Sequence, residues 1–490
     1  MDSEELANQK LHIFFFPLMA YGHMIPLIDM AKLFAARGVK TTVILTPNNA
    51  SVFSKSIDRE RSFGLDIHIQ ILRFPSVEAG LPEGVENIDD IRSAELLPYH
   101  FPAIKMLQEP FEQLLKLHQP DFIVADMFVT FTTAAANKYG IPRFVFHGTG
   151  FFPLCVEHSL ICHKPHEGLA SDTEIFVVPG LPDKIEMTRL QLSDHFIDAS
   201  SSEFWDEVRE SVQGSFGILV NSFHELEPAY ATHYKNDLGK KAWSIGPVCL
   251  RNKDDIDKAQ RGKKTTIDGH FILNWLDSKE SHSVLYICFG STYSRFSKAQ
   301  WLEIARGLEE SGSPFIWVLR AFKNEEVEDG SLLPEGFEDR MEGKGLIIRD
   351  WVPQMLILDH QAVGGFMTHC GWNSLLEGLS AGVPMVTWPI FSEQFYNEIL
   401  ITQVLKIGFR AGIEKWHNWT TDIKGVPVKK EKIVNVINRL MGDGEEANNM
   451  RTRAKELSDL AKETTDQGGS SYENLTSLIE MFKKPLSEMF

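Results

Sequence analysis

Short runs of apolar residues recur along the chain and constrain its fold more than any other feature. The first two runs cover residues 11–17 and 40–46, and the segment between them has helical spacing that stops at Gly38. Further runs at 120–128 and 141–150 flank a short helical stretch. Strands that are apolar on both faces are typical of parallel sheets covered by helices on either side. The pattern therefore predicts an α/β fold built from βαβ units.

A second series of the same kind follows in the other half of the chain. Apolar runs alternate there with helical segments, at residues 283–291, 314–320, 345–351, 362–369 and 383–389. A chain of 490 residues exceeds the about 100 to 200 residues of an ordinary domain. We therefore expect two Rossmann-like α/β domains that face each other across a cleft.

The two series are separated by a polar stretch. Residues 251–266 are nearly free of apolar side chains, which is typical of an exposed linker between domains. The domains expected from this boundary are an N-terminal domain over 1–250 and a C-terminal domain over 267–470. A final segment, 471–490, has helical spacing.

Charge and cysteine content exclude several classes of function. A formal net charge of -18 argues against a broad basic surface of the kind that binds nucleic acid or anionic lipid. A phosphorylated ligand would need local attraction instead. The five cysteines form no C-x-x-C pair, so neither a disulfide framework nor a zinc site is expected. We expect a cytoplasmic protein without an integral membrane segment, since no run of about 18 apolar residues occurs.

Polar side chains gather between two apolar runs at residues 366–394. Asn373 and Ser374 follow a predicted strand and begin a helix, where unpaired backbone NH groups and the helix dipole attract anions. Ser374 and Glu377 also match a capping box that would only complete the helix end. His369, at the end of the strand, is either an anion contact or a core histidine. Both interpretations stay open from spacing alone.

Four more residues near this cluster are candidates for a ligand site. Trp351 and Trp372 are flat side chains suited to stacking on a base, although single tryptophans are more often core residues. Glu393 and Gln394 lie between a strand and a helix, where they can bind hydroxyl groups or cap the helix. A stacking ring, an anion site and hydroxyl-binding side chains together meet the needs of a nucleotide sugar.

The stretch from Trp351 to Gln394 resembles the signature box of plant family 1 UDP-dependent glycosyltransferases, and the resemblance extends over essentially the whole chain. It implies a GT-B fold, an acceptor-binding N-terminal domain and a UDP-sugar-binding C-terminal domain. It also implies that the final helix packs back on the N-terminal domain. The branch it resembles glycosylates flavonoids, terpenoids and related aglycones.

The resemblance assigns donor contacts residue by residue. It implies that Trp351 stacks on uracil, that Gln354 and Glu377 meet the ribose hydroxyls, that Asn373, Ser374, His369 and Ser291 hold the phosphates, and that Glu393, Gln394 and Thr149 contact the sugar. Glutamine at position 394 is typical of glucose donors in this family. Trp372 stands where some glucuronosyl-transferring members carry arginine. UDP-glucose is therefore the expected co-substrate, with UDP-galactose, UDP-glucuronic acid and UDP-xylose as alternatives.

Sugar transfer needs a base, because an acceptor hydroxyl is a poor nucleophile until its proton is removed. His23 lies in the predicted loop after the first strand, and histidine has a pKa close to working pH. Asp126 ends a predicted parallel strand, where a carboxylate can orient an imidazole. Incidental loop and capping roles are the alternatives. In the family pattern both match the base and its acidic partner, so His23 and Asp126 are the expected catalytic pair.

The expected reaction is a single displacement that inverts the anomeric carbon and needs no metal ion. The expected acceptor is an apolar hydroxylated small molecule of flavonoid, triterpenoid or steroid type, which can itself carry a sugar. It is expected to lie near Tyr21, Phe128, Phe151 and Phe152. These four residues match core positions equally well. A hydrolase is disfavoured by the lack of a G-x-S-x-G elbow, and a non-catalytic nucleotide-sugar-binding protein by the presence of both His23 and Asp126. We expect a monomer.

Overall fold

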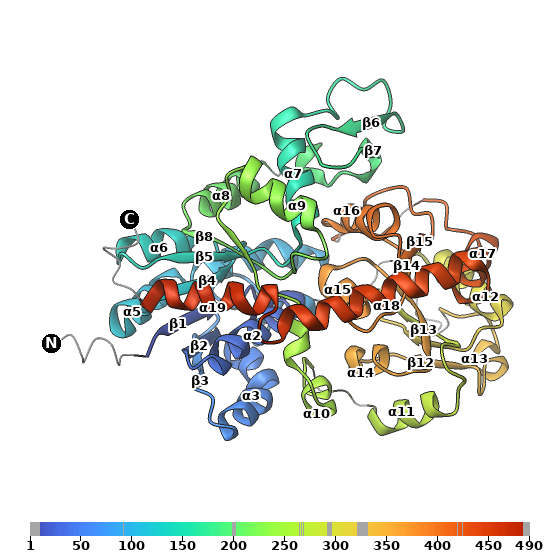
Figure 1. The fold of residues 1–490 in the computed structure, drawn as a ribbon, viewed down its shortest axis with the longest axis horizontal. Coiled ribbons are helices and arrows are strands. Elements are labelled where there is room, and N and C mark those ends of the chain that lie inside the picture. The colour runs from blue at the N-terminus through green and yellow to red at the C-terminus, as the bar shows by residue number, and fades with distance from the viewer. Residues whose placement is uncertain are drawn as a thin grey trace. The chain divides into compact units, whose positions relative to one another are not determined.

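The chain forms two compact units, each with its own parallel sheet (Figure 1). The computed structural model describes residues 10–91, 93–197, 202–263, 265, 267, 269–291, 296–320, 332–418, 420–423 and 425–483. Unit 1 comprises residues 1–151, 199–262 and 461–490, and unit 2 comprises residues 152–198 and 263–460. Both units are thus assembled from separate pieces of the chain. The domain limits expected from the sequence stay a prediction.

The sheet of unit 1 has seven parallel strands in the order β3-β2-β1-β4-β5-β8-β9. The strands are β1 (His12–Phe16), β2 (Lys40–Leu45), β3 (Ile67–Ile71), β4 (Phe122–Asp126), β5 (Arg143–Phe146), β8 (Gly217–Val220) and β9 (Ala242–Ser244). The helices of this unit are α2 (Tyr21–Ala36), α3 (Pro47–Ser62), α4 (His100–Lys105), α5 (Gln108–His118), α6 (Phe131–Lys138), α8 (Ser202–Gln213), α9 (Pro228–Thr232), α10 (Asp255–Ala259) and α19 (Ser470–Lys483).

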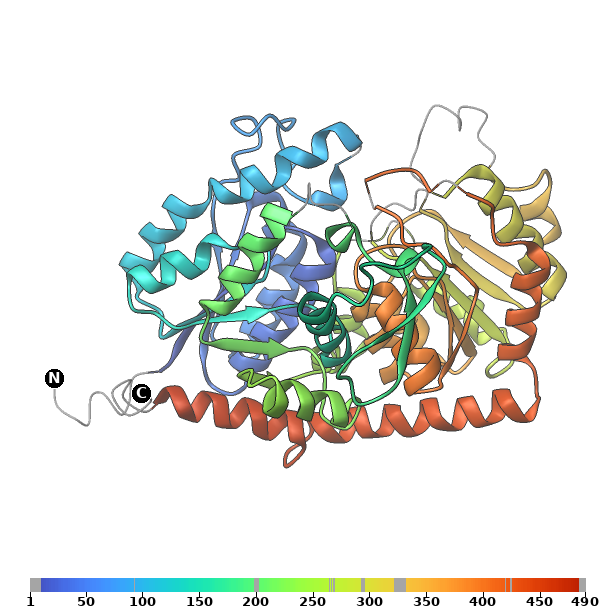
Figure 2. The same ribbon diagram turned by 90° about the horizontal axis from the view of Figure 1, so that it is seen from above.

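Strand β1 shows why these apolar runs become buried strands. Successive side chains point to opposite faces of a strand, and both faces are covered here. On one face Phe16 meets Phe111 of α5 and Phe131 of α6, with ring centroids 5.0 and 5.9 Å apart. On the other face Phe15 meets Phe34 of α2 at 5.5 Å. Figure 2 shows these blue and cyan helices around the blue strands. The continuous apolar pattern thus reflects helices on both sides of the sheet.

The C-terminal helix α19 packs against the part of unit 1 that contains β9. Asn474 Nδ2 donates to the carbonyl of Ser244 at 3.0 Å, and Ser471 Oγ donates to the carbonyl of Gly246 at 2.6 Å. The guanidinium of Arg37 lies 3.3 Å from the ring centroid of Tyr472. These contacts tie the last described helix to a sheet formed by the first half of the chain.

The sheet of unit 2 has six parallel strands in the order β12-β11-β10-β13-β14-β15. The strands are β10 (Val284–Cys288), β11 (Phe315–Val318), β12 (Gly345–Ile348), β13 (Val363–Thr368), β14 (Met385–Thr387) and β15 (Gly408–Arg410), and an antiparallel pair is formed by β6 (Ile175–Val178) and β7 (Ile185–Thr188). The helices are α7 (Phe151–His163, whose first residue belongs to unit 1), α11 (Gly269–Asp277), α12 (Lys298–Ser311), α13 (Phe337–Arg340), α14 (Gln354–Leu358), α15 (Trp372–Ser380), α16 (Gln394–Ile399), α17 (Lys430–Met441) and α18 (Glu445–Thr465, whose last residues belong to unit 1).

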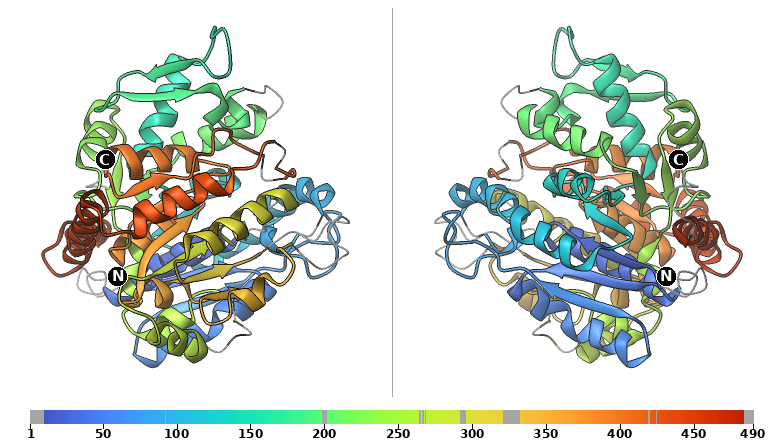
Figure 3. Two further views of the ribbon diagram at one scale, coloured as in Figure 1. Left: turned by 90° about the vertical axis from the view of Figure 1, so that its right-hand side faces the viewer. Right: turned by 90° about the vertical axis from the view of Figure 1, so that its left-hand side faces the viewer.

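Both faces of the second sheet are also covered, as the yellow and orange elements in Figure 3 show. On one face Trp317 of β11 lies against Trp301 of α12, with ring centroids 5.8 Å apart. On the other face Tyr286 of β10 stacks on Phe366 of β13 at 5.1 Å, under α14 and α15. The prediction of two Rossmann-like α/β domains is therefore confirmed.

Each predicted strand is present, but most end earlier than the apolar run suggests. The run 345–351, for example, forms a strand only over Gly345–Ile348. The first helix is a larger correction. It begins at Tyr21, so His23 lies in its first turn rather than in a loop, and Pro26 is the sixth helical residue.

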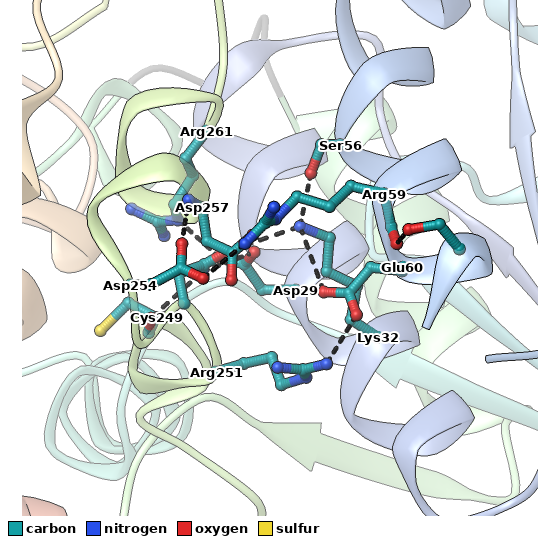
Figure 4. Close-up of polar contacts among 12 residues, drawn as sticks. Asp29, Lys32, Ser56, Arg59, Glu60, Cys249, Arg251, Asp254, Asp257 and Arg261 are labelled. Atoms are coloured by element: carbon teal, nitrogen blue, oxygen red, sulfur yellow. Dashed lines mark hydrogen bonds and ion pairs between the residues drawn. The ribbon is translucent and has the colours of Figure 1, made fainter. Parts of the chain in front are cut away.

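The first part of the segment expected to be an exposed linker, residues 251–262, belongs to unit 1 and is partly packed there, which corrects the expectation of full exposure (Figure 4). Arg251 pairs with Glu60 at 2.6 Å and Arg261 pairs with Asp29 at 2.6 Å. Asn252 is only 2% exposed and donates to Asp29. These polar residues neutralise buried partners on α2 and α3. Composition alone cannot distinguish charges paired in this way from charges in water.

No helix among the described residues is long and apolar enough to cross a membrane.

Candidate active site

In each sheet the strand order reverses at one point, and ligands of open α/β sheets bind outside the carboxyl ends of the strands there. In unit 1 this point lies between β1 and β4, and in unit 2 it lies between β10 and β13. The residues that follow β1 and end β4 include His23 and Asp126. Those that follow β10 and β13 include Ser291 and His369. The candidate residues thus lie where the topology favours a ligand.

His23 and Asp126 are in direct contact. Nδ1 of His23 lies 2.6 Å from Oδ2 of Asp126. Asp126 is the last residue of β4 and is completely buried, whereas the His23 side chain is 26% exposed. A carboxylate accepts, so Nδ1 carries the proton and Nε2 of the neutral ring has a lone pair. The pair therefore has the arrangement of a general base with an orienting acid.

Two further groups hold Asp126 in place. The backbone NH of Phe128 donates to its Oδ1 at 3.0 Å, and Nη2 of Arg143 donates to its main-chain carbonyl at 3.0 Å. Arg143 also donates to Thr132 and Ser215. Burial lowers the pKa of Arg143 to about 9, while the charge of Asp126 acts in the opposite direction. The acid of the pair is thus fixed through its side chain and its backbone.

A group of aromatic rings lies on one side of His23, which contacts it through Phe128. The ring of Phe128 lies 5.7 Å from the imidazole of His23. Phe101 lies 6.1 Å from the Phe128 ring, Phe204 stacks on it at 6.0 Å, and Trp205 meets it edge-on at 5.6 Å. All four rings are partly exposed. They form an aromatic wall next to the base, and sequence reasoning identified only Phe128.

The other three residues expected to line the acceptor site are buried. Tyr21 is 3% exposed, and Phe151 and Phe152 are 0% exposed. Their burial matches the core role that was the alternative for each. Thr149 lies in the turn between β5 and α7, and its Oγ1 is buried without a hydrogen-bond partner among the described residues. A buried hydroxyl in this state is suited to a ligand contact.

A tight turn after β13 positions His369. Cys370 has a φ of +67°, which is strained for a residue with a side chain, and Gly371 precedes the helix α15. Burial lowers the pKa of His369 to about 4, so its imidazole is neutral. Its Nδ1 has no hydrogen-bond partner among the described residues. A neutral ring with an unpartnered nitrogen can meet a phosphate without bringing a charge.

The start of α15 carries three of the predicted donor residues. Trp372, Asn373 and Ser374 are its first three residues. The capping box is not formed, because the helix begins two residues before Ser374 and no side chain caps it. Trp372 is only 3% exposed. The backbone NH groups and the helix dipole at such a helix start favour an anion.

Ser374 and Glu377 are joined by Gln354, the first residue of α14. Nε2 of Gln354 donates to Glu377 Oε2 at 2.7 Å and to Ser374 Oγ at 3.1 Å. Its Oε1 lies 3.2 Å from the hydroxyl of Tyr286 on β10. The two residues expected to meet the ribose are thus hydrogen-bonded to each other.

Glu393 and Gln394 lie at the start of α16. The carbonyl oxygen of Gln394 accepts from the backbone NH groups of Ile390 and Phe391, at 2.9 and 3.1 Å. This leaves its Nε2 to donate to a ligand. Glu393 accepts from Ser392 at 2.6 Å and from Asn397 at 3.2 Å, and it is partly exposed. The pair offers one donor group and one acceptor group side by side in sequence.

Arg320 is a residue that sequence reasoning missed. It follows β11, and its Nη1 donates to the carbonyl of Ser291 at 2.5 Å. Its guanidinium lies 5.9 Å from the ring centroid of the partly exposed Trp351. The side chain therefore brings a positive charge to the strand ends where a phosphate was expected. A single arginine after an apolar run carries no motif, so only its contacts reveal it.

The described residues thus form two groups. Unit 1 brings His23, Asp126 and the aromatic wall together, and unit 2 brings together the Gln354 network, with His369, Arg320 and Gln394 at neighbouring strand ends. No group of three or more His, Cys, Asp or Glu side chains in the described ranges is placed to hold a metal ion.

Comparison with known proteins shows the family of this chain. The family model described as UDP-glucoronosyl and UDP-glucosyl transferase matches residues 115–409. A scopoletin glucosyltransferase of Nicotiana tabacum is 52% identical, with 96% of this chain and 98% of the relative covered. An anthocyanin 3'-O-beta-glucosyltransferase of Gentiana triflora is 49% identical over the same shares of both chains.

A solved structure is also similar over nearly its whole length. The crystal structure of Glycyrrhiza uralensis UGT73P12 complexed with glycyrrhetinic acid 3-O-monoglucuronide has a TM-score of 0.92 and 42% sequence identity, with 97% of this chain and 96% of that chain covered. The chain has two Rossmann-like units with polar strand ends, and its fold matches this solved structure. Together these features define a glycosyltransferase of the GT-B class. The chain belongs to the plant UDP-dependent glycosyltransferase family and is an enzyme of that family.

Proposed function

We propose that this enzyme transfers glucose from UDP-glucose to a hydroxyl group of an aromatic plant metabolite, with inversion at the anomeric carbon. The observation that carries the proposal is the 2.6 Å contact between His23 and the buried Asp126, at the point where the strand order of unit 1 reverses. A base held in this way next to partly exposed aromatic rings is suited to activating a phenolic hydroxyl.

The reaction is proposed to proceed in one displacement. The acceptor oxygen attacks the anomeric carbon while its proton passes to Nε2 of His23. The bond between that carbon and the phosphate oxygen breaks, and its electron pair leaves with UDP. Asp126 stabilises the imidazolium that forms. Because attack occurs on the face opposite the leaving group, an α-linked donor gives a β-glucoside.

The departing diphosphate needs positive or hydrogen-bonding partners. The NH groups at the start of α15 and the neutral imidazole of His369 are proposed to supply hydrogen bonds. Ser374 accepts from Gln354, so its own hydroxyl proton is left to donate to an oxygen. Arg320 is proposed to add a charge that the resemblance did not identify. These groups provide the local attraction that a chain of net charge -18 needs for an anionic ligand.

The sugar is proposed to lie against Glu393 and Gln394. The amide oxygen of Gln394 is occupied by two backbone NH groups, so the side chain presents donors to sugar hydroxyls. Glu393 presents acceptors. Glucose is the proposed sugar because the Nicotiana tabacum and Gentiana triflora relatives are named glucosyltransferases.

The acceptor is proposed to stack on the aromatic wall of Phe101, Phe128, Phe204 and Trp205. Aromatic pairs of this kind contribute about 0.5 to 1.5 kcal/mol beyond the burial of apolar area. The wall favours a flat aromatic molecule, in line with relatives whose names refer to scopoletin and anthocyanin. A triterpenoid or steroid acceptor would gain less from these rings.

The cytoplasmic location, the monomeric state and the independence from metal ions stay predictions.

Substitution of the base tests the proposal. His23→Ala should lower kcat by about 10²- to 10⁴-fold, the usual contribution of a positioned base, while UDP binds as before. A matched control is His68→Ala, since the partly exposed His68 also contacts an aspartate, Asp66, at 2.8 Å. The measurement is acceptor-dependent release of UDP. An unchanged rate for His23→Ala would remove His23 from the reaction.

A further inference from the structure

Tyr286 is a buried residue to which the reaction above gives no role. It lies in the middle of β10, is 0% exposed and stacks on Phe366 with an angle of 22° between the rings. Its hydroxyl reaches Gln354 Oε1 at 3.2 Å and also meets the thiol of Cys288. The ring packing fixes where this hydroxyl points.

The donor and acceptor at each contact from Tyr286 through Gln354 to Glu377 follow from what these groups can do. An ionised carboxylate only accepts, so the nitrogen of the Gln354 amide must face Glu377. The amide oxygen then faces Tyr286, and the phenol must donate to it. Burial raises the pKa of Tyr286 well above its usual range, so the phenol keeps its proton at working pH. The chain of donors therefore runs from Tyr286 through Gln354 to Glu377.

We propose that Tyr286 is a positioning residue for the nucleotide: its hydroxyl holds the Gln354 amide so that Nε2 keeps the Glu377 carboxylate ready to accept from the ribose hydroxyls. The inference rests on the proposed function, in which Gln354 and Glu377 meet the ribose. It adds a residue that never touches the ligand and acts through the orientation of an amide.

The change Tyr286→Phe removes one hydroxyl and keeps the ring that stacks on Phe366. Gln354 Oε1 then loses its donor, and the amide can rotate away from Glu377. Ribose contacts weaken in the ground state and in the transition state alike, because the ribose is remote from the reacting carbon. KM for UDP-glucose should therefore rise severalfold while kcat changes little.

The decisive measurement uses UDP, 2'-deoxy-UDP and 3'-deoxy-UDP as probes, with binding to the full-length protein followed by calorimetry. The wild-type protein should bind UDP about tenfold or more tightly than at least one deoxy analogue, as expected for a lost hydrogen bond to a carboxylate. In Tyr286→Phe this ratio should fall at least about threefold, since the carboxylate is no longer held in place. A general loss of stability would weaken all three ligands equally and leave the ratio unchanged.

Ser458→Ala is the matched control, because it also removes a buried hydroxyl from unit 2, one that donates to the carbonyl of Ser380 at 2.6 Å. Its ratio should equal that of the wild type. An unchanged ratio in Tyr286→Phe would overturn the inference. A wild-type protein that does not discriminate UDP from either analogue would instead refute the ribose role of Gln354 and Glu377, so the two failures are distinguishable.

A second variant keeps the inference testable if Tyr286→Phe fails to fold. Gln354→Leu removes the amide through which Tyr286 acts, and it should reduce the ratio as well. Where both single variants fold, the double variant should show no further decrease in the ratio of UDP affinity to deoxy-UDP affinity. A normal ratio in Gln354→Leu, or losses that add in the double variant, would contradict a chain of action from Tyr286 through Gln354.

Discussion

At the scale of single residues, two glycines explain how His369 fits at the strand ends. A side chain at Gly290 would place its Cβ 2.7 Å from Nε2 of His369, and one at Gly371 would come closer still. Gly290 also has a φ of +96°, which favours glycine, whereas Gly371 has an ordinary φ of -62°. The two glycines therefore let the backbone approach the imidazole on both sides.

The substitution Gly371→Ala isolates this contact, because its backbone suits alanine. The added Cβ should displace the imidazole, weaken UDP binding by about tenfold or more and destabilise the fold by about 1 to 3 kcal/mol. Calorimetry with UDP and thermal unfolding measure the two effects. Gly269→Ala is the control, since nothing lies within 4 Å of a Cβ there. UDP affinity that survives Gly371→Ala would show that His369 does not hold the phosphates.

Residues with a local pattern could be predicted, and residues known only by their contacts could not. The sequence identified His369, Asn373 and Ser374 as candidates because His369 ends an apolar run and the other two lie at the start of the helix that follows. Arg320 follows a strand and Tyr286 lies within one, both without any motif, and their roles depend on partners far away in sequence. The same holds for Phe101, Phe204 and Trp205, which meet Phe128 only in the folded chain.

At the scale of elements, helix α16 combines a proposed donor site with a buried acid. Glu398 is 1% exposed, accepts from Thr387 at 2.7 Å and pairs with Arg410 at 3.2 Å. Burial raises its pKa from 4.5 to about 7, against the opposing effects of Arg410 and Thr387. The folded state thus holds a proton that the unfolded chain has already released between these two pH values.

The contribution of Glu398 to the stability of the protein should therefore fall as pH rises through this window. Below pH 4.5 both states are protonated, and above about pH 7 both are ionised, so the contribution of Glu398 changes only in between. The full change is about 3 kcal/mol. Glu398→Gln cannot ionise, so its stability relative to the wild type should improve by that amount from pH 4.5 to above pH 7. Unfolding curves at several pH values measure the difference.

The exposed Glu342 provides the comparison. Glu342→Gln should follow the pH dependence of the wild type. The raised pKa of Glu398 would be contradicted if the free energies of unfolding of Glu398→Gln and the wild type differed by the same amount at every pH.

The elements themselves were partly predictable. Apolar runs located the strands of both sheets, because burial on two faces leaves a continuous pattern in the sequence. The start of α2 was missed because no capping residue marks it: Ala20 precedes the helix and no side chain caps it. The exposure of segment 251–266 was overestimated because several of its charges, which pair with Asp29, Arg59 and Glu60 in the structure, look solvated in the sequence.

At the scale of the whole molecule, two units with the same reversal of strand order carry different chemistry. Unit 1 has a buried acid that orients a histidine beside aromatic rings, and unit 2 has a helix end, an arginine and an amide network suited to a nucleotide. The sequence predicted the α/β class of both units, but the strand order follows only from pairing in the folded chain. Acidic chains can still bind an anion when such groups converge locally.

The anomeric configuration of the product tests the proposed reaction most directly. The enzyme is incubated with UDP-glucose and a phenolic acceptor such as a hydroxycoumarin or a flavonoid, and the glucoside is examined by proton NMR. Single displacement with His23 as the base predicts a β-glucoside. An α-glucoside, or free glucose with no glucoside formed, would contradict the proposal.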